Sequence, residues 1–454
     1  MPGRAPSIRR FRSTSRLTAA LVGLVLALPA AAQDLFEVYR QAQSYDAVYA
    51  AARHSVDAGR ERRPQGLALL LPTLNLSSQA TRTRNELDSR DPLVLPSTTR
   101  YPESVGYTLT FTQPLFRYQN WIQYDQGQAQ VKQAEATYAN AYQDLITRVA
   151  QAYFDVLAAQ DTLALVRAQK AAISEQLAQA KRNFEVGTAT ITDTHEAQAR
   201  YDLTTALEIQ AQNDVDTKIR ALQQLTGKEY SSLKPLRPDV KLSPPNPSNM
   251  QTWVDIAERS SYPVQVQEAG TRIADLEAKR NRAAHLPTVD LVASQFMQTQ
   301  SGSAVAGVGS ELTQSTISLQ LAVPLYAGGA LTSREREAAA NYEKSRQDLE
   351  NARRSSALST RQFFLLVANG IAAVAALEQA LVSSQSALDS NKLGYEVGVR
   401  INIDVLNAQQ QLFSTRRDLA VARYNTITNH LRLKSASGSL AESDLEEVNR
   451  ALAP

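Results

Sequence analysis

"EVGTATITDTHEAQ" (Glu185–Gln198) and "EVGVRINIDVLNAQ" (Glu396–Gln409) are the stretches that decide the fold of this chain. They share the frame Glu-Val-Gly, then a segment with Ile that ends at Asp, then Ala-Gln, and they lie 211 residues apart. A separation that large is longer than a coiled-coil or solenoid period. We therefore predict that a whole structural half is duplicated within the 454 residues.

The composition favours long helices. Aromatic residues make up 6% of the chain, and Gly and Pro number 18 each. Residues 1–32 carry five arginines, an apolar run and three final alanines, which predicts a cleavable signal peptide. Without these five arginines the formal charge falls from +3 by five units to −2. Nucleic acid is therefore not an expected partner.

Each half follows the same order of patterns. A helical stretch (35–67 and 253–284) leads to Leu-Pro-Thr and then to two segments in which apolar and polar residues alternate. Alternation with period two predicts strands that have one apolar face. Proline cannot donate to a strand ladder but fits a helix start, so four prolines are expected to mark strand–helix junctions. They are Pro72, Pro114, Pro287 and Pro324.

Beyond the second strand of each half the period becomes helical. A helix from about residue 118 to about residue 186 would be about 100 Å long at 1.5 Å per residue. In the second half, apolar residues recur every seven positions, as in a coiled coil. These residues are Val367, Val374, Leu381, Leu388 and Tyr395.

The quoted frames are expected to be the tips of helical hairpins. Gly187 and Gly398 follow the long helices, where a left-handed residue usually ends a helix. Thr190 with Asp193, and Asn402 with Asp404, then offer an N-cap and a first-turn acid for a returning helix. The returning helices would run to the matching glycines, Gly227 and Gly438.

This order divides the chain into five parts. A signal peptide (1–32) precedes a first repeat (33–233) made of a helix, two strands, a long helix and a returning helix. A proline-rich linker (234–250) leads to a second repeat with the same order (251–438). A short C-terminal helix or tail (439–454) follows.

A membrane would have to be crossed by strands of several copies. The chain has no cysteine to carry a lipid, and its richest apolar run after the leader, 367–382, is interrupted by Asn369 and Glu378. An open sheet in lipid would leave unpaired amides that cost several kcal/mol each. Since membrane barrels have at least about eight strands, one chain with four strands cannot close one.

The chain resembles the TolC family of outer-membrane exit ducts. The stretches that carry the resemblance run in order through both repeats: "DLFEVYRQAQ", "AYFDVLAAQDTL", "FEVGTATITDTHEAQARYD", "HLPTVDLVAS", "PLYAGG", "YEVGVRINIDVLNAQ" and "ARYNTITNHLRLKSASG". The resemblance implies an α+β membrane protein with an internal structural duplication. It also implies a homotrimer, in which three chains of four strands form one 12-stranded β-barrel that continues into a long α-helical coiled-coil tunnel across the periplasm.

The resemblance also assigns roles to residues at the tips. Tyr395 and Arg400 match a tyrosine and an arginine that bond to a threonine–aspartate pair, here Thr192 and Asp193, and hold the periplasmic gate shut. The alternative is that Tyr395 is the last heptad residue and Asp193 only a helix cap. The segments that match an adaptor contact are Val186, Gly187 and Thr188, and Val397, Gly398 and Val399.

Asp404 matches an acidic ring at the constriction of the tunnel, where three copies would concentrate cations. The next ring of the family is also acidic, but Asn407 stands at that position here. One carboxylate ring in place of two argues against strong cation selectivity.

No enzymatic motif is complete. "HEAQA" at His195 begins like the helix of a zinc protease, but Ala199 occupies the position of the second histidine. We therefore expect no catalytic site, no cofactor and no metal.

The function expected is that of an outer-membrane channel, the exit duct of a tripartite type I secretion or efflux system. Outer-membrane lipid, a periplasmic adaptor (membrane fusion protein) and an inner-membrane ABC transporter or proton-driven pump are the expected partners. The missing lipid-anchor cysteine favours export of proteins, such as toxins, over drug efflux. A multidrug efflux duct is the first alternative, and a soluble periplasmic coiled-coil adaptor is the second.

Overall fold

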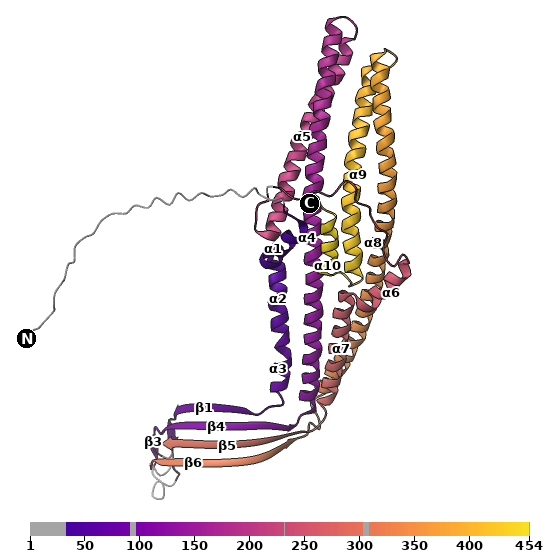
Figure 1. The fold of residues 1–454 in the computed structure, drawn as a ribbon. Coiled ribbons are helices and arrows are strands. Elements are labelled where there is room, and N and C mark those ends of the chain that lie inside the picture. Colours follow the sequence, from indigo (N-terminus) through magenta and orange to yellow (C-terminus); the bar gives the residue numbers. More distant parts are fainter. Residues whose placement is uncertain (1–32, 91–96, 231, 303–307, 454) are drawn as a thin grey trace, which may run out of the picture.

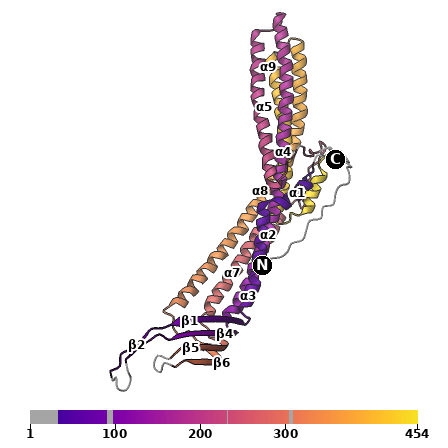
Figure 2. The same ribbon diagram turned by 90° about the vertical axis from the view of Figure 1, so that its left-hand side faces the viewer.

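The computed structural model describes residues 33–90, 97–230, 232–302 and 308–453. The expected signal peptide lies outside the described residues. The chain forms an elongated bundle of helices with a sheet at one end and the tips of two helical hairpins at the other (Figure 1). Figure 2 shows that the sheet and the tips lie at opposite ends from the side as well.

Two long helices extend from the sheet to the tips. α4 (Tyr118–Glu185) has 68 residues and α8 (Ala330–Glu396) has 67, so each is about 100 Å long. α5 (Ile191–Thr226) returns beside α4, and α9 (Asn402–Ala436) returns beside α8. The long helices and the hairpins expected from the sequence are confirmed.

The main sheet has the strand order β1–β4–β5–β6, and all neighbouring strands are antiparallel. Its strands are β1 (Thr73–Arg82), β4 (Glu103–Phe116), β5 (Thr288–Gln300) and β6 (Ser310–Ala322). A separate ribbon, β2 (Asn85–Leu87) with β3 (Thr98–Arg100), lies between β1 and β4 in the chain. β1 and β6 are therefore the free edges of the main sheet, and they run in opposite directions.

The register separates an apolar face from a polar face. Leu74 pairs with Phe111, Phe111 with Ala293, and Ala293 with Ile317, so four apolar residues form one row across the sheet. The adjacent row, on the other face, is Asn75, Thr110, Ser294 and Thr316. Several large apolar side chains of the first face are exposed in the single chain: Leu74, Leu76, Tyr107, Leu109, Met297, Ile317, Leu319 and Leu321.

Three of the four junction prolines flank a strand. Pro72 directly precedes β1, Pro287 directly precedes β5, and Pro324 follows β6. Pro114 instead lies inside β4, opposite Asp290, where the register of the ladder shifts between Pro114 and Phe116. The missing N–H of a proline suits such an irregular position.

The helical stretch expected over 35–67 is divided into α1 (Leu35–Tyr45), α2 (Ala47–Arg60) and α3 (Arg62–Ala68). At the first break Asp46 leaves the helical conformation, with φ −59° and ψ 118°. Its carboxylate then caps α2 by accepting a hydrogen bond from the Tyr49 amide at 2.6 Å. A capping aspartate thus ends one helix and begins the next.

The stretch expected over 253–284 is divided in the same way into α6 (Met250–Ser260) and α7 (Tyr262–Ala283). Ser261 between them is extended, and Pro263 lies in the first turn of α7, where proline is well tolerated. Each half therefore contains short helices, two long strands, a long helix and a returning helix, which confirms the internal duplication.

The largest core lies at the middle of the bundle, where α1, α4, α5, α9 and α10 (Glu442–Arg450) meet. Phe154 of α4 stacks against Tyr424 of α9, and the Tyr424 hydroxyl donates to Asp161 of α4 at 2.6 Å. This contact joins the two repeats. Other fully buried members of the core are Leu35, Val38, Tyr39, Leu145, Val149, Tyr153, Leu222 and Leu445.

The heptad residues of α8 behave as expected, since Val367, Val374 and Leu388 are buried. By length and composition α8 is also apolar enough to cross a membrane, although only 11% of its apolar window is buried in the chain. By this criterion, the interruptions at Asn369 and Glu378 do not exclude a spanning helix, contrary to the expectation from the sequence. Leu365, Leu366 and Val382 of this region are exposed.

Candidate functional site

The hairpin tips are built alike in the two repeats. Gly187 and Gly398 both have φ of +79°, a left-handed conformation that glycine adopts readily. The Gly187 amide donates to the Phe184 carbonyl at 3.0 Å, and the Gly398 amide donates to the Tyr395 carbonyl at 3.1 Å. No other atom lies within 4 Å of the position of a Cβ at either glycine, so conformation and not crowding selects glycine here.

Apolar side chains project from both tips. Val186 is 73% exposed, Val397 66% and Val399 76%, although valine is usually buried in folded proteins. Thr188 is held by its own turn, since its hydroxyl donates to the Asn183 carbonyl at 3.1 Å. The residues expected to contact an adaptor are thus accessible in the single chain.

Asp193 takes part in a local capping box. Its carboxylate accepts from the amide and the hydroxyl of Thr190, at 3.0 and 2.8 Å, and its own amide donates to the Thr190 hydroxyl at 3.3 Å. The N-cap expected at Thr190 is confirmed. Thr192 beside it is exposed, and within the described chain its side chain forms no hydrogen bond with the second hairpin.

Tyr395 and Arg400 have other partners than the expected pair. The Tyr395 hydroxyl accepts a hydrogen bond from Asn183 of α4 at 3.2 Å, so it does link the two hairpins. The Arg400 guanidinium lies 3.7 Å from the carboxylate of Asp404, which is four residues later, in the first turn of α9. Within one chain the structure therefore does not bring Tyr395 or Arg400 to Thr192 and Asp193, and the gate of these four residues stays a prediction.

Asn402 corrects an expectation. It was expected to cap α9, but the N-cap position is Ile401, and the fully buried Asn402 is the first residue of the helix. Its Oδ1 accepts from Gln176 Nε2 at 2.6 Å, and its Nδ2 donates to the Asp193 carbonyl at 3.2 Å. A buried amide must have partners, and Asn402 finds both on the other hairpin. Nothing in the local sequence of Asn402 indicates this contact between the hairpins.

A third link between the hairpins joins α5 to α9. Arg200 donates from Nη1 to Gln410 Oε1 at 2.6 Å and from Nη2 to Asn407 Oδ1 at 3.0 Å. Asn407 is exposed, and the Asp404 side chain, three residues earlier on α9, is 34% exposed. Arg200 was also missed, because nothing in its local sequence indicates a partner more than 200 residues away.

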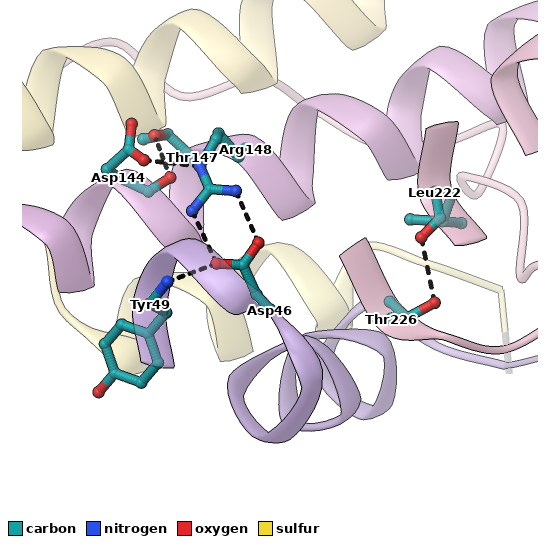
Figure 3. Close-up of polar contacts among 7 residues, drawn as sticks. All are labelled: Asp46, Tyr49, Asp144, Thr147, Arg148, Leu222 and Thr226. Atoms are coloured by element: carbon teal, nitrogen blue, oxygen red, sulfur yellow. Dashed lines mark hydrogen bonds and ion pairs between the residues drawn. The ribbon is translucent and has the colours of Figure 1, made fainter. Parts of the chain in front are cut away.

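At the waist of the bundle a charged clamp fixes α2 against α4 (Figure 3). Arg148 donates to both carboxylate oxygens of Asp46, at 2.9 and 3.2 Å, and to Asp144 at 2.6 Å. Burial alone would raise the pKa of Asp46, but the hydrogen bonds from Arg148 and from the Tyr49 amide outweigh it and lower that pKa. This clamp lies far from the tips and serves the assembly of the bundle.

No group of three or more His, Asp or Glu side chains that could hold a metal ion occurs among the described residues. His195 in "HEAQA" lies in the second turn of α5. Some polar groups of the tips cap their own turns, and others, such as Asn402 and Arg200, link the two hairpins.

Comparisons with known proteins agree with the two repeated halves of the chain. The sequence model of the family described as "Outer membrane efflux protein" matches residues 38–228 and 253–439, one segment in each repeat. The outer membrane protein TolC of Vibrio cholerae is 34% identical over 422 residues, which cover 93% of this chain and 94% of the relative. The protease secretion protein PrtF of Dickeya chrysanthemi is 33% identical over 441 residues, which cover 95% of each chain.

Among solved structures, the outer membrane protein VceC of Vibrio cholerae superposes with a TM-score of 0.75 at 18% identity, over 89% of this chain and 96% of that one. This likeness confirms the fold class expected from the sequence, a membrane protein with barrel strands and a long helical tunnel. The proteins of this family are channels and not enzymes. The chain belongs to the outer membrane efflux protein family, and it is an outer-membrane duct.

Proposed function

We propose that three copies of this chain close a 12-stranded barrel in the outer membrane, continued by a helical tunnel in the periplasm. The free edges of the sheet carry this proposal. β1 and β6 run in opposite directions, so β6 of one copy can pair with β1 of the next in the same antiparallel manner as all other neighbours. Closure removes unpaired edge amides, each of which costs several kcal/mol in lipid.

The two faces of the sheet support this orientation. The apolar face would contact lipid and the polar face would line the barrel, as in other membrane barrels. Apart from Asp290, the polar face of the described strands carries no charged residue between Thr73 and Gln320 and is rich in Thr, Ser and Gln. Asp290 is paired with Arg117, which donates to its two carboxylate oxygens at 2.8 and 2.6 Å.

A wall of this kind suits export of unfolded protein. Hydroxyl and amide groups form weak, exchangeable hydrogen bonds, and an uncharged wall does not retain a polypeptide that carries charges of both signs. PrtF, whose name describes secretion of proteases, covers almost the whole chain at 33% identity. We infer that this duct serves type I secretion of proteins. Multidrug efflux is the alternative, since the family name describes efflux.

The tips are the proposed docking site of the partners. The exposed valines, Val186, Val397 and Val399, offer small apolar contacts to the helical hairpin of a periplasmic adaptor. An inner-membrane ABC transporter would supply the energy, and a proton-driven pump would do so if the substrate is a drug. A soluble adaptor role does not explain the two-faced sheet.

Disulfide cross-linking tests the barrel, because the natural chain has no cysteine. We expect a cysteine at Ser77 of β1, combined with cysteines at successive positions of β6, to form covalent trimers in outer-membrane vesicles at one register and not at its neighbours. Recovery of a soluble monomer at every position would contradict the duct. Loss of a secreted protein from the medium of a deletion strain, with unchanged drug sensitivity, would distinguish protein export from efflux.

A further inference from the structure

Arg200 is placed where its charge can act on the tunnel mouth. It lies on α5, in the first hairpin, and its guanidinium reaches across to α9 in the second. Asn407 and Gln410, its two acceptors, are three residues apart and so lie on one face of α9. The two hydrogen bonds, at 3.0 and 2.6 Å, hold the planar guanidinium beside Asn407.

The acceptors hold this cation without neutralising it. Both are amide oxygens, and within the described chain no carboxylate lies within 4 Å of the Arg200 guanidinium. Glu196, one turn earlier on α5, is not paired with it. Asp404, the acid nearest along α9, lies beside Arg400 at 3.7 Å. Among the described residues, Arg200 is therefore a cation without a paired acid, whereas Arg400 lies beside Asp404.

We propose that Arg200 determines the ion preference of the tunnel mouth. In the trimer, three guanidinium groups would form a positive ring at the level of Asn407 and offset the carboxylates of Asp404. The inference rests on the proposed channel and goes further, because it assigns the selectivity to a residue outside the expected constriction ring.

The size of the effect follows from Coulomb's law. If each guanidinium lies about 8 Å from the path of the ions, in water at about 0.1 M salt, one unit charge changes the local concentration of a monovalent ion by roughly 1.5-fold, and three copies by roughly threefold. The effect has opposite sign for anions. Removal of the three charges should therefore raise the ratio of cation to anion permeability by up to roughly tenfold, and by at least about threefold if only one of the two ions is affected.

Reversal potentials across a potassium chloride gradient in planar bilayers test the proposal. We expect the reversal potential of Arg200→Gln to correspond to a ratio of cation to anion permeability at least about threefold higher than that of the natural chain. Arg200→Lys keeps the charge and should keep most of the natural ion preference. The control is Arg220→Gln, which removes the same charge from the same helix about 30 Å away, beyond the screening length. All variants are first shown to be trimers by electrophoresis.

A second variant measures the contact itself. Asn407→Asp should raise cation preference less in the natural chain than in Arg200→Gln, because Arg200 pairs with the new carboxylate. Equal potentials for the natural chain and Arg200→Gln, or equal shifts from Arg200→Gln and Arg220→Gln, would overturn the role of Arg200. Absence of conductance in the natural chain and in all variants would overturn the proposed channel itself.

Discussion

Replacement of Asn402 by alanine tests whether the buried amide contact holds the two hairpins together at the tip. Asn402 is fully buried, accepts from Gln176 at 2.6 Å and donates to the Asp193 carbonyl at 3.2 Å. If the tunnel mouth opens by movement of the second hairpin away from the first, both bonds break. In the alanine variant these two bonds are absent before any movement of the hairpins.

The magnitude follows from the burial of the partners. Gln176 is only 6% exposed, so loss of its acceptor leaves a buried amide unsatisfied, which costs about 1 to 3 kcal/mol. The bond to the Asp193 carbonyl adds about 1 kcal/mol. The closed arrangement thus loses roughly 2 to 4 kcal/mol per chain, which raises the open-to-closed ratio roughly 30- to 700-fold.

Single-channel recording in planar bilayers measures this ratio as the open probability. The matched control is Asn391→Ala, because Asn391 lies half-buried near the same tip and, among the described residues, bonds only to the Ala387 carbonyl of its own helix. We expect Gln176→Ala to act in the same direction and the double variant with Asn402→Ala to be less than additive. An unchanged open probability in Asn402→Ala, with trimers intact, would refute the reasoning.

Three further predictions follow from the contacts described above. Asp46→Asn should lower the free energy of unfolding at neutral pH by about 1 to 3 kcal/mol, as measured by thermal melting. Because the folded-state pKa of Asp46 is lowered, its stabilisation is present above the ordinary pKa of Asp and is lost as the pH falls through the lower, folded value, so the variant should lose less stability than the natural chain in acid. The double change Tyr395→Phe with Arg400→Ser should raise single-channel conductance severalfold without loss of trimers, and unchanged conductance would favour the view that these residues only pack and cap. Asp404→Ala should lower cation preference in reversal potentials and weaken block by multivalent cations from the periplasmic side, and an unchanged potential would place Asp404 outside the conduction path.

The fold could be predicted because its signals are local. The left-handed glycines of the tips, the alternation in the strands and the heptads of α8 each act within a few residues of the chain. The breaks at Asp46 and Ser261 were missed because a continuous apolar pattern runs through them. Pro263 was a sequence signal for the second break, since proline favours the first turn of a helix, whereas the break at Asp46 shows only in its capping contact.

The partners at the tip could not be predicted in the same way, because each polar side chain has a local and a distant option. Asp193 can cap its own helix through Thr190, three residues away, and the closed capping box satisfies it within its own turn. Asn402 has the sequence of a cap, but burial against the first hairpin gives it partners that only the packing of α4 and α9 supplies.

The chemistry of these links bears on how the mouth could be opened. The contacts of Asn183 with Tyr395 and of Gln176 with Asn402 join uncharged side chains. Salt screens interactions between charges but not hydrogen bonds between uncharged groups, so a change in ionic strength should not release these contacts. A signal that opens the mouth must therefore provide competing contacts to the hairpins themselves. The exposed valines at the tips are the part of the chain that offers such contacts, which is why docking and opening should be one event.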